Sequence, residues 1–162
     1  MTRLLIVDDV PLFRAGLSSA LNEAGFEVVG EAGSAEDAVA QAEVLQPDLV
    51  LLDVLMPGLS GLDVVGKIVA VSEDSQVILL TGSESEEDMI SAIKSGARGY
   101  IVKDMPFANL VDLIRAVADG GAAFSPKMAG KMVDVLRQLL RHQELFKSRK
   151  PTLTGREIEV LQ

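Results

Sequence analysis

Three acidic residues follow apolar runs at two places in this sequence. Asp8 and Asp9 come directly after the run LLIV, and Asp53 comes directly after LVLL. A carboxylate at the end of a buried run costs free energy unless something pairs with it. Two further apolar runs, at 76–81 and 98–103, end at Thr81 and Lys103. A hydroxyl and an ammonium group therefore stand at positions equivalent to those of the acids.

This set of side chains predicts phosphoryl transfer. Carboxylates that converge in one crevice repel each other, and a hard cation with oxygen ligands, Mg²⁺ above all, relieves that repulsion. A carboxylate can also act as a nucleophile and become an aspartyl phosphate. The cation and Lys103 would neutralise the charge on the transferring group, and the Thr81 hydroxyl would hydrogen-bond it. Taken singly, the residues have simpler interpretations: Asp8 and Asp9 as a helix cap, and Lys103 as a solvated surface side chain.

Strands must bring these residues to one edge of a sheet. Five runs rich in Val, Ile and Leu are predicted strands: Arg3–Asp8, Phe26–Ala32, Asp48–Asp53, Gln76–Thr81 and Arg98–Lys103. Nearly continuous apolar runs are typical of parallel strands covered on both faces. Helix-period segments lie between and after them, near 11–24, 34–45, 60–70, 84–95 and 106–119. Five βα units in series predict an α/β fold with a doubly wound parallel sheet.

Local signals mark where these helices begin and end. Ser83–Glu86 fits a capping box, and Ser34 begins a weaker version of the same pattern. Gly25, Gly96 and Gly120 stand where helices should end, because glycine accepts the left-handed conformation of a C-terminal cap.

The composition limits the classes of function. The chain has 162 residues and a net charge of −9, but residues 1–120 carry −13 and residues 121–162 carry +4. The acidic body does not attract nucleic acid. No apolar run approaches the ~20 residues that span a bilayer, so no membrane partner is expected. The N-terminus reads as a strand and not as a signal peptide, and a sequence without cysteine fits a cytoplasmic protein.

The order of motifs through residues 1–120 resembles the receiver domain of bacterial two-component response regulators. The motifs are "LLIVDDV", "LVLLDVLMPGLSGLD", "VILLTG" and "GARGYIVKD". The resemblance implies a flavodoxin-like (βα)5 fold with strand order 2-1-3-4-5. It also implies that Asp53 accepts a phosphoryl group from a sensor histidine kinase, and that the protein catalyses only its own phosphorylation and dephosphorylation.

The same resemblance implies a role for each site residue. Lys103 would pair with the phosphoryl group, while Thr81 would move toward it and the Tyr100 ring would follow inward. The Mg²⁺ ligands would be the carboxylates of Asp8, Asp9 and Asp53 and the backbone carbonyl of Leu55.

The C-terminal part differs in kind from the rest. The stretch "LTGREIEVLQ" resembles the opening of the helix-turn-helix output domain of NarL/LuxR-type regulators. We therefore expect a receiver at 1–120, a helical linker at 121–151 and the start of a truncated DNA-binding domain at 152–162. DNA would be bound only through the missing part of that domain.

One helix over 125–147 is expected in the linker. Its apolar residues recur at the a and d spacing of a heptad, with Met132, Val135, Leu139 and Phe146 on the stripe. Leu136, Leu140 and Leu145 widen this stripe. Two partners fit this stripe: the same helix of a second chain, which gives a homodimer, or the receiver of the same chain.

Three other functions are alternatives to a phosphorylation-controlled response regulator. Aspartyl-phosphate phosphatases also place a nucleophilic Asp after an apolar strand, but their second acid stands two residues on, where this chain has Leu55. A flavin- or nucleotide-binding module would need glycines in the first βα loop, which here reads "DDVPLF". A receiver whose output is protein binding alone differs from the leading reading only at the short C-terminal motif.

Overall fold

The computed structural model describes residues 1–53, 61–82 and 86–149, without the side chains of 61–62 and 145–149. The chain forms two units, Met1–Met128 and Ala129–Gln162. Within the described part, no helix combines the length and the apolar character that crossing a bilayer requires.

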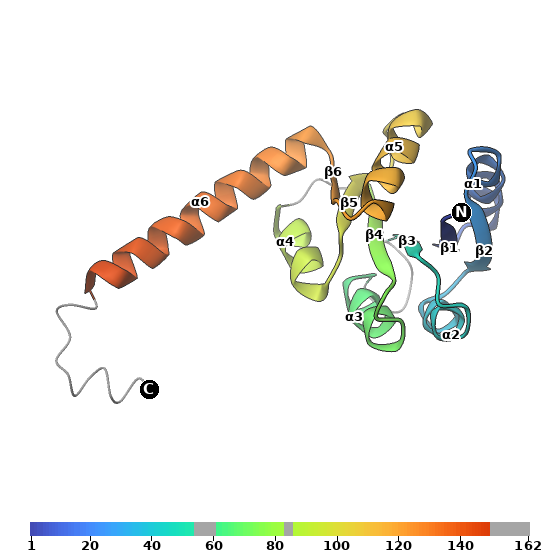
Figure 1. The fold of residues 1–162 in the computed structure, drawn as a ribbon, viewed down its shortest axis with the longest axis horizontal. Coiled ribbons are helices and arrows are strands. Elements are labelled where there is room, and N and C mark those ends of the chain that lie inside the picture. The colour runs from blue at the N-terminus through green and yellow to red at the C-terminus, as the bar shows by residue number, and fades with distance from the viewer. Residues whose placement is uncertain (54–60, 83–85, 150–162) are drawn as a thin grey trace. The chain divides into compact units, whose positions relative to one another are not determined.

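A six-stranded parallel sheet forms the centre of the first unit (Figure 1). Its strands lie in the order β2-β1-β3-β4-β5-β6, so the predicted order 2-1-3-4-5 is confirmed. The strands are β1 (Arg3–Val7), β2 (Glu27–Ala32), β3 (Leu49–Asp53), β4 (Gln76–Thr81), β5 (Gly99–Val102) and β6 (Ala123–Phe124).

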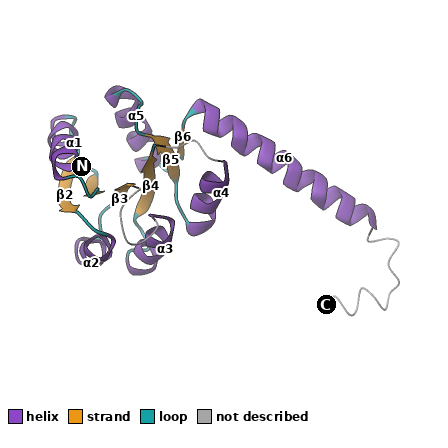
Figure 2. Ribbon diagram, turned by 180° about the vertical axis from the view of Figure 1, so that it is seen from behind, coloured by secondary structure: helices purple, strands orange, loops and turns teal. Residues whose placement is uncertain are grey.

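Helices cover both faces of this sheet (Figure 2). They are α1 (Pro11–Glu23), α2 (Ala35–Leu45), α3 (Gly61–Val71), α4 (Glu86–Ser95) and α5 (Phe107–Ala118), and α6 (Pro126–Arg149) follows β6. Buried side chains of α1 and α5 share one core cluster with the strands. On the other face α2 packs against α3, and α3 packs against α4. The predicted doubly wound α/β fold is therefore confirmed.

Alternation along the strands decides which side chains meet which helices. Leu4, Ile6, Leu49 and Leu51 belong to the core cluster shared with α1 and α5. Because successive side chains of a strand point to opposite faces, Asp53 is in phase with the α1/α5 face. By the same alternation, Thr81 and Tyr100 are in phase with the face that α2, α3 and α4 cover.

The predicted signals for helix ends act as expected where the structure describes them. Ser34 Oγ accepts a hydrogen bond from the backbone N–H of Asp37 at 3.2 Å, which caps α2. Gly25, Gly96 and Gly120 have φ of 100°, 107° and 96°, the left-handed region that ends a helix at little cost for glycine. The predicted capping box at Ser83–Glu86 falls largely outside the described residues.

The sixth strand was not predicted. It has only two residues, and it pairs with β5 through Gly99 and Tyr100. A Cβ atom on Gly99 would lie 2.7 Å from the carbonyl oxygen of Ala123, so this close approach requires glycine. The sheet thus extends past residue 120, where the sequence pattern changes.

The long helix expected over 125–147 is present as α6, a single helix of 24 residues. Ser125 Oγ accepts a hydrogen bond from the backbone N–H of Met128 at 3.3 Å, the contact of an N-terminal cap. Pro126 is its first residue, where a missing N–H costs nothing.

Candidate functional site

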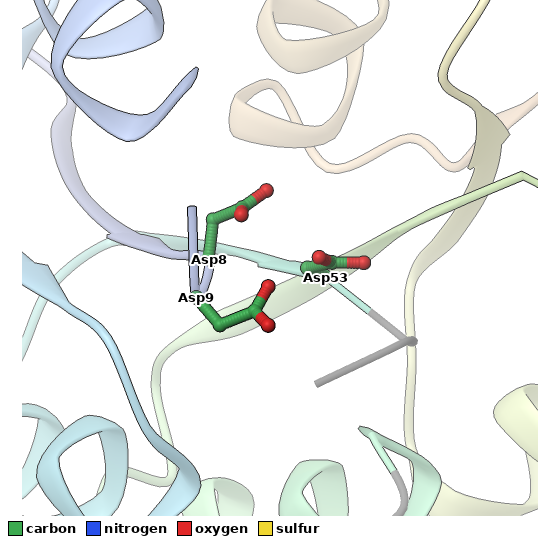
Figure 3. Close-up of side chains that lie close together, drawn as sticks. All are labelled: Asp8, Asp9 and Asp53. Atoms are coloured by element: carbon green, nitrogen blue, oxygen red, sulfur yellow. The ribbon is translucent and has the colours of Figure 1, made fainter. Parts of the chain in front are cut away.

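The acidic residues meet where the strand order reverses. β1 lies between β2 and β3, and Val7 pairs in register with Leu52, so Asp8 and Asp53 leave neighbouring strands at the same edge. In open α/β sheets ligands bind at such a switch point, at the carboxyl ends of the strands. Figure 3 shows the carboxylates of Asp8, Asp9 and Asp53 around one space. One oxygen from each lies within 4.8 Å of the others.

These carboxylates are poorly solvated. Asp8 is 2% exposed and Asp53 is 3% exposed, while Asp9 is partly exposed. One oxygen of Asp8, Oδ1, accepts a hydrogen bond from the backbone N–H of Val10 at 2.8 Å. This contact is an Asx turn before α1 and not a helix cap, because the N-cap residue of α1 is Val10 and no side chain caps that helix. It uses only one carboxylate oxygen of Asp8. The other, Oδ2, faces Lys103.

Lys103 joins the two strand ends. Its Nζ lies 3.1 Å from Asp53 Oδ2 and 3.5 Å from Asp8 Oδ2. Its backbone N–H donates to the carbonyl oxygen of Thr81 at 2.7 Å, which holds it beside the end of β4. The solvated surface position is therefore wrong for this lysine, although 29% of its side chain remains accessible.

Thr81 and Tyr100 form a buried pair on the α4 side of the sheet. Tyr100 is fully buried and Thr81 is 1% exposed, and their hydroxyl groups share a hydrogen bond. Burial raises the pKa of the Tyr100 phenol above its usual 10.0, the hydrogen bond with Thr81 lowers it in part, and the nearby carboxylate of Asp88 raises it. The ring that was expected to move inward is already inside, with its hydroxyl hydrogen-bonded to Thr81.

The remaining predicted residues divide into two groups. Leu55 lies outside the described residues, as does the side chain of Phe146. On α6, Leu139 is exposed, whereas Met132 and Val135 are half-buried. Leu136 and Leu140, which were expected to widen the stripe, are exposed as well, and so is Val133, which was not predicted.

Two residues of the first turns of α1 were not predicted as part of the site. Arg14 Nη1 donates to the backbone carbonyl of Asp8 at 2.6 Å, and Arg14 Nε lies 3.3 Å from Glu31 Oε1. Phe13 places its ring 5.1 Å from Lys103 Nζ, measured to the ring centroid. The available signal was position, because Phe13 and Arg14 stand in the first turn of the helix that directly follows Asp8 and Asp9.

The donor set fits a divalent cation. Three carboxylates face one space, and Lys103 is the only cation within ion-pair distance of Asp8 or Asp53 in the described parts of the chain. Carboxylate oxygens at this separation suit a hard ion such as Mg²⁺, and one ammonium group leaves the site with net negative charge.

The open parallel sheet and the acidic pocket at its switch point are those expected of a receiver domain. Comparison with known families gives the same class. The model of the response regulator receiver domain matches residues 4–115. The chain therefore belongs to the response regulator receiver domain family. Its relatives identify it further as a receiver of the LuxR family of two-component response regulators.

Three similar proteins cover most of the chain. The nitrate/nitrite response regulator protein NarP of Escherichia coli is 37% identical over 98% of this chain and 72% of its own length. The uncharacterized transcriptional regulatory protein YxjL of Bacillus subtilis is 35% identical over 99% of this chain and 73% of its own. A crystal structure of a LuxR-family two-component response regulator from Aurantimonas has a TM-score of 0.78 and 29% identity, covering 83% of this chain and 96% of that one.

Proposed function

We propose that Asp53 accepts a phosphoryl group from a phosphohistidine of a sensor kinase and that this reaction switches a transcriptional output. The observation that carries the proposal is the pairing of Asp53 with Lys103 at 3.1 Å beside two further carboxylates. One crevice then holds the Asp53 nucleophile, the Lys103 ammonium for the oxygens of the transferring group, and an acidic site for a metal ion. A role as a turnover enzyme is not favoured, because no acid stands two residues after Asp53.

The chemical step needs little from the protein beyond position and charge. A carboxylate oxygen of Asp53 forms the new O–P bond while the N–P bond to the histidine breaks, and the electron pair of that bond stays on the imidazole nitrogen. The Lys103 ammonium is near enough to move onto a phosphoryl oxygen, since its Nζ lies 3.1 Å from Asp53 Oδ2, and 29% of its side chain is accessible. The Thr81 hydroxyl, at the end of β4, would turn from Tyr100 toward the same group and supply a hydrogen bond to it.

Mg²⁺ would be held by Asp8, Asp9 and Asp53, together with the backbone carbonyl of Leu55. The bound ion would supply positive charge to the phosphoryl oxygens and relieve repulsion among the carboxylates. Arg14 and Val10 contribute indirectly, because their hydrogen bonds to Asp8 keep the end of β1 in place.

The direct test is intact mass after incubation with acetyl phosphate and Mg²⁺. We expect the mass of one phosphoryl group to be gained, and to be lost again at high pH because acyl phosphates hydrolyse there. Chelation of the metal should lower the labelling rate by at least roughly an order of magnitude, since the carboxylates then repel the incoming phosphate. A chain that gains no phosphoryl group, or gains it equally fast without metal, contradicts the proposal.

The proposed role in transcription depends on two partners, a sensor kinase and DNA. The relatives are named response regulators and transcriptional regulatory proteins, and residues 152–162 resemble the opening of a DNA-binding domain. We therefore assign 1–120 to the receiver, 121–151 to a linker whose first residues add β6 to the receiver sheet, and DNA binding to a helix-turn-helix domain that starts at 152. A cytoplasmic location follows from this assignment, because the DNA and the kinase active site are both there.

A homodimer through α6 is part of the proposal. Val133, Leu136, Leu139 and Leu140 are 49–59% exposed, and their spacing puts them on one side of the helix. An isolated helix of this length is marginal in water, so burial of such a face would stabilise it. The same face on a second copy is the partner we propose, because the heptad spacing is typical of helices that pair with one another.

We expect the double substitution Leu136→Glu and Leu139→Glu to convert dimers to monomers. Each buried leucine contributes roughly 1.5–3 kcal/mol to an interface, and a buried carboxylate opposes it further. Light scattering checks the result, and acetyl phosphate labelling should persist. Gln138→Glu is the matched control, because this exposed residue lies off the apolar side and should leave dimers intact. An unaltered chain that stays monomeric at high concentration, phosphorylated or not, contradicts the dimer.

A further inference from the structure

Lys103 has a neighbour that the proposed function does not use. The ring of Phe13, in the first turn of α1, has its centroid 5.1 Å from Lys103 Nζ. Phe13 is 40% exposed, so burial in the core does not account for an aromatic residue at this position. Phe107, at the start of α5, is exposed to the same degree and has no cation over its ring among the described residues.

The distance is that of a cation–π contact. The face of an aromatic ring carries partial negative charge and attracts an ammonium group within about 6 Å of the centroid. Lys103 thus lies among three attractive groups: the ring and the carboxylates of Asp8 and Asp53. A leucine of similar bulk could fill the space beside the lysine stem, but it would not attract the charge.

Phe13 is also tied to the acidic end of β1. The backbone N–H of Val10 bonds Asp8 Oδ1, and Arg14, the next residue after Phe13, bonds the carbonyl oxygen of Asp8. Pro11 begins the helix and restricts the backbone there. The ring therefore has a defined place relative to Asp8, while the long side chain of Lys103 has four rotatable bonds to restrain.

We propose that Phe13 is a positioning residue for Lys103. Its ring face holds the ammonium group over the Asp8–Asp53 pair, which increases the fraction of time that the cation is in place for an incoming phosphoryl group. The proposal rests on the proposed function, because it assigns Lys103 to the transferring oxygens. It concerns the chemical step itself and does not require a partner protein to touch Phe13.

Three variants of the full chain separate the ring's charge distribution from its bulk. Phe13→Leu keeps an apolar side chain without the aromatic face, and Phe13→Tyr keeps the face. Phe107→Leu makes the same chemical change at a ring of equal exposure without a cation. Thermal melting of each variant shows that it is folded, which we expect because both phenylalanines are partly exposed.

The first readout is NMR of the Lys103 side chain without metal or phosphate. Its terminal methylene signals, identified by their absence in Lys103→Ala, should be shifted upfield by the ring in the unaltered chain and in Phe13→Tyr. In Phe13→Leu they should return to the position of an ordinary lysine. Unchanged signals in Phe13→Leu overturn the contact, whatever happens to activity.

The second readout is the rate of labelling by acetyl phosphate with Mg²⁺. We expect a fall of about two- to fivefold in Phe13→Leu, the factor that corresponds to an exposed cation–π contact, and recovery in Phe13→Tyr. The rate in Phe107→Leu should equal that of the unaltered chain. An unaltered rate in Phe13→Leu overturns the positioning role. Failure of the unaltered chain to label overturns the proposed function itself, and with it the role of Phe13.

Discussion

Asp53→Asn should abolish phosphoryl labelling: we expect the rate to fall by more than about 10³-fold, because the nucleophile is lost. The amide has nearly the shape of the carboxylate but lacks the anionic oxygen that attacks phosphorus. The change also removes one negative charge from a cluster whose oxygens lie within 4.8 Å of one another. The folded variant should therefore be at least as stable as the unaltered chain without metal. Intact mass after incubation with acetyl phosphate measures the effect.

Asp48→Asn is the matched control for this experiment. Asp48 immediately precedes the same strand at its opposite end, where its carboxylate accepts a hydrogen bond from the backbone N–H of Arg3 at 2.8 Å. It is exposed and far along β3 from the acidic site, so labelling should be unchanged. Labelling that survives in Asp53→Asn and disappears when Asp8 or Asp9 is changed instead would move the acceptor to another residue.

Lys103→Ala should slow labelling by about 10²-fold, the usual cost of removing one donor that stabilises charge on the reacting oxygens. The site should still bind metal, because the three carboxylates remain. The larger consequence concerns the response of the fold. Lys103 is hydrogen-bonded through its backbone to Thr81, and Thr81 shares a hydrogen bond with Tyr100. Movement of Lys103 toward the phosphoryl group is therefore linked through these hydrogen bonds to Thr81 and Tyr100.

Tyr100 reports this response without any label. The chain has one tyrosine and no tryptophan, so its intrinsic fluorescence comes from Tyr100. Phosphorylation of the unaltered chain should change that emission. In fully labelled Lys103→Ala the change should be less than roughly half as large, because the charged hydrogen bond between the ammonium group and the phosphoryl group is missing. Lys94→Ala, on the exposed side of α4, is the control and should respond like the unaltered chain. An undiminished change in Lys103→Ala contradicts a role for the ammonium group in the switch.

The acidic site was predictable because its residues are strand-end residues. In a parallel sheet every strand ends at the same edge, so Asp8, Asp53, Thr81 and Lys103 are brought close by topology alone. Their side-chain contacts were not predictable to the same degree. Asp8 presents one oxygen to the N–H of Val10 and the other to Lys103, and this arrangement depends on side-chain rotamers and on the turn into α1.

Short-range signals explain the success at the helix ends. The Ser34 side chain caps α2 by bonding the backbone N–H only three residues away, and Gly25, Gly96 and Gly120 adopt positive φ because they lack a Cβ atom. Both effects are local to the chain. The two-residue strand β6 gives no periodic pattern, and it forms only because β5 offers an unpaired edge and Gly99 admits close approach. The linker helix lies between these cases. Its position and its apolar stripe follow from the sequence, but the exposure of Val133 and the partial burial of Met132 and Val135 do not.

The sequence by itself determined the order of the elements, the edge of the sheet that carries the chemistry and the acids that gather there. These follow from periodicity, local capping and the parallel connection of strands, which are properties of short stretches and their order. Only the tertiary structure decided that Tyr100 is inside, bonded to Thr81, and that the Phe13 ring lies over Lys103. Such contacts join residues from different elements, and their free energies depend on distances that packing sets to within an ångström or so, which no local pattern encodes.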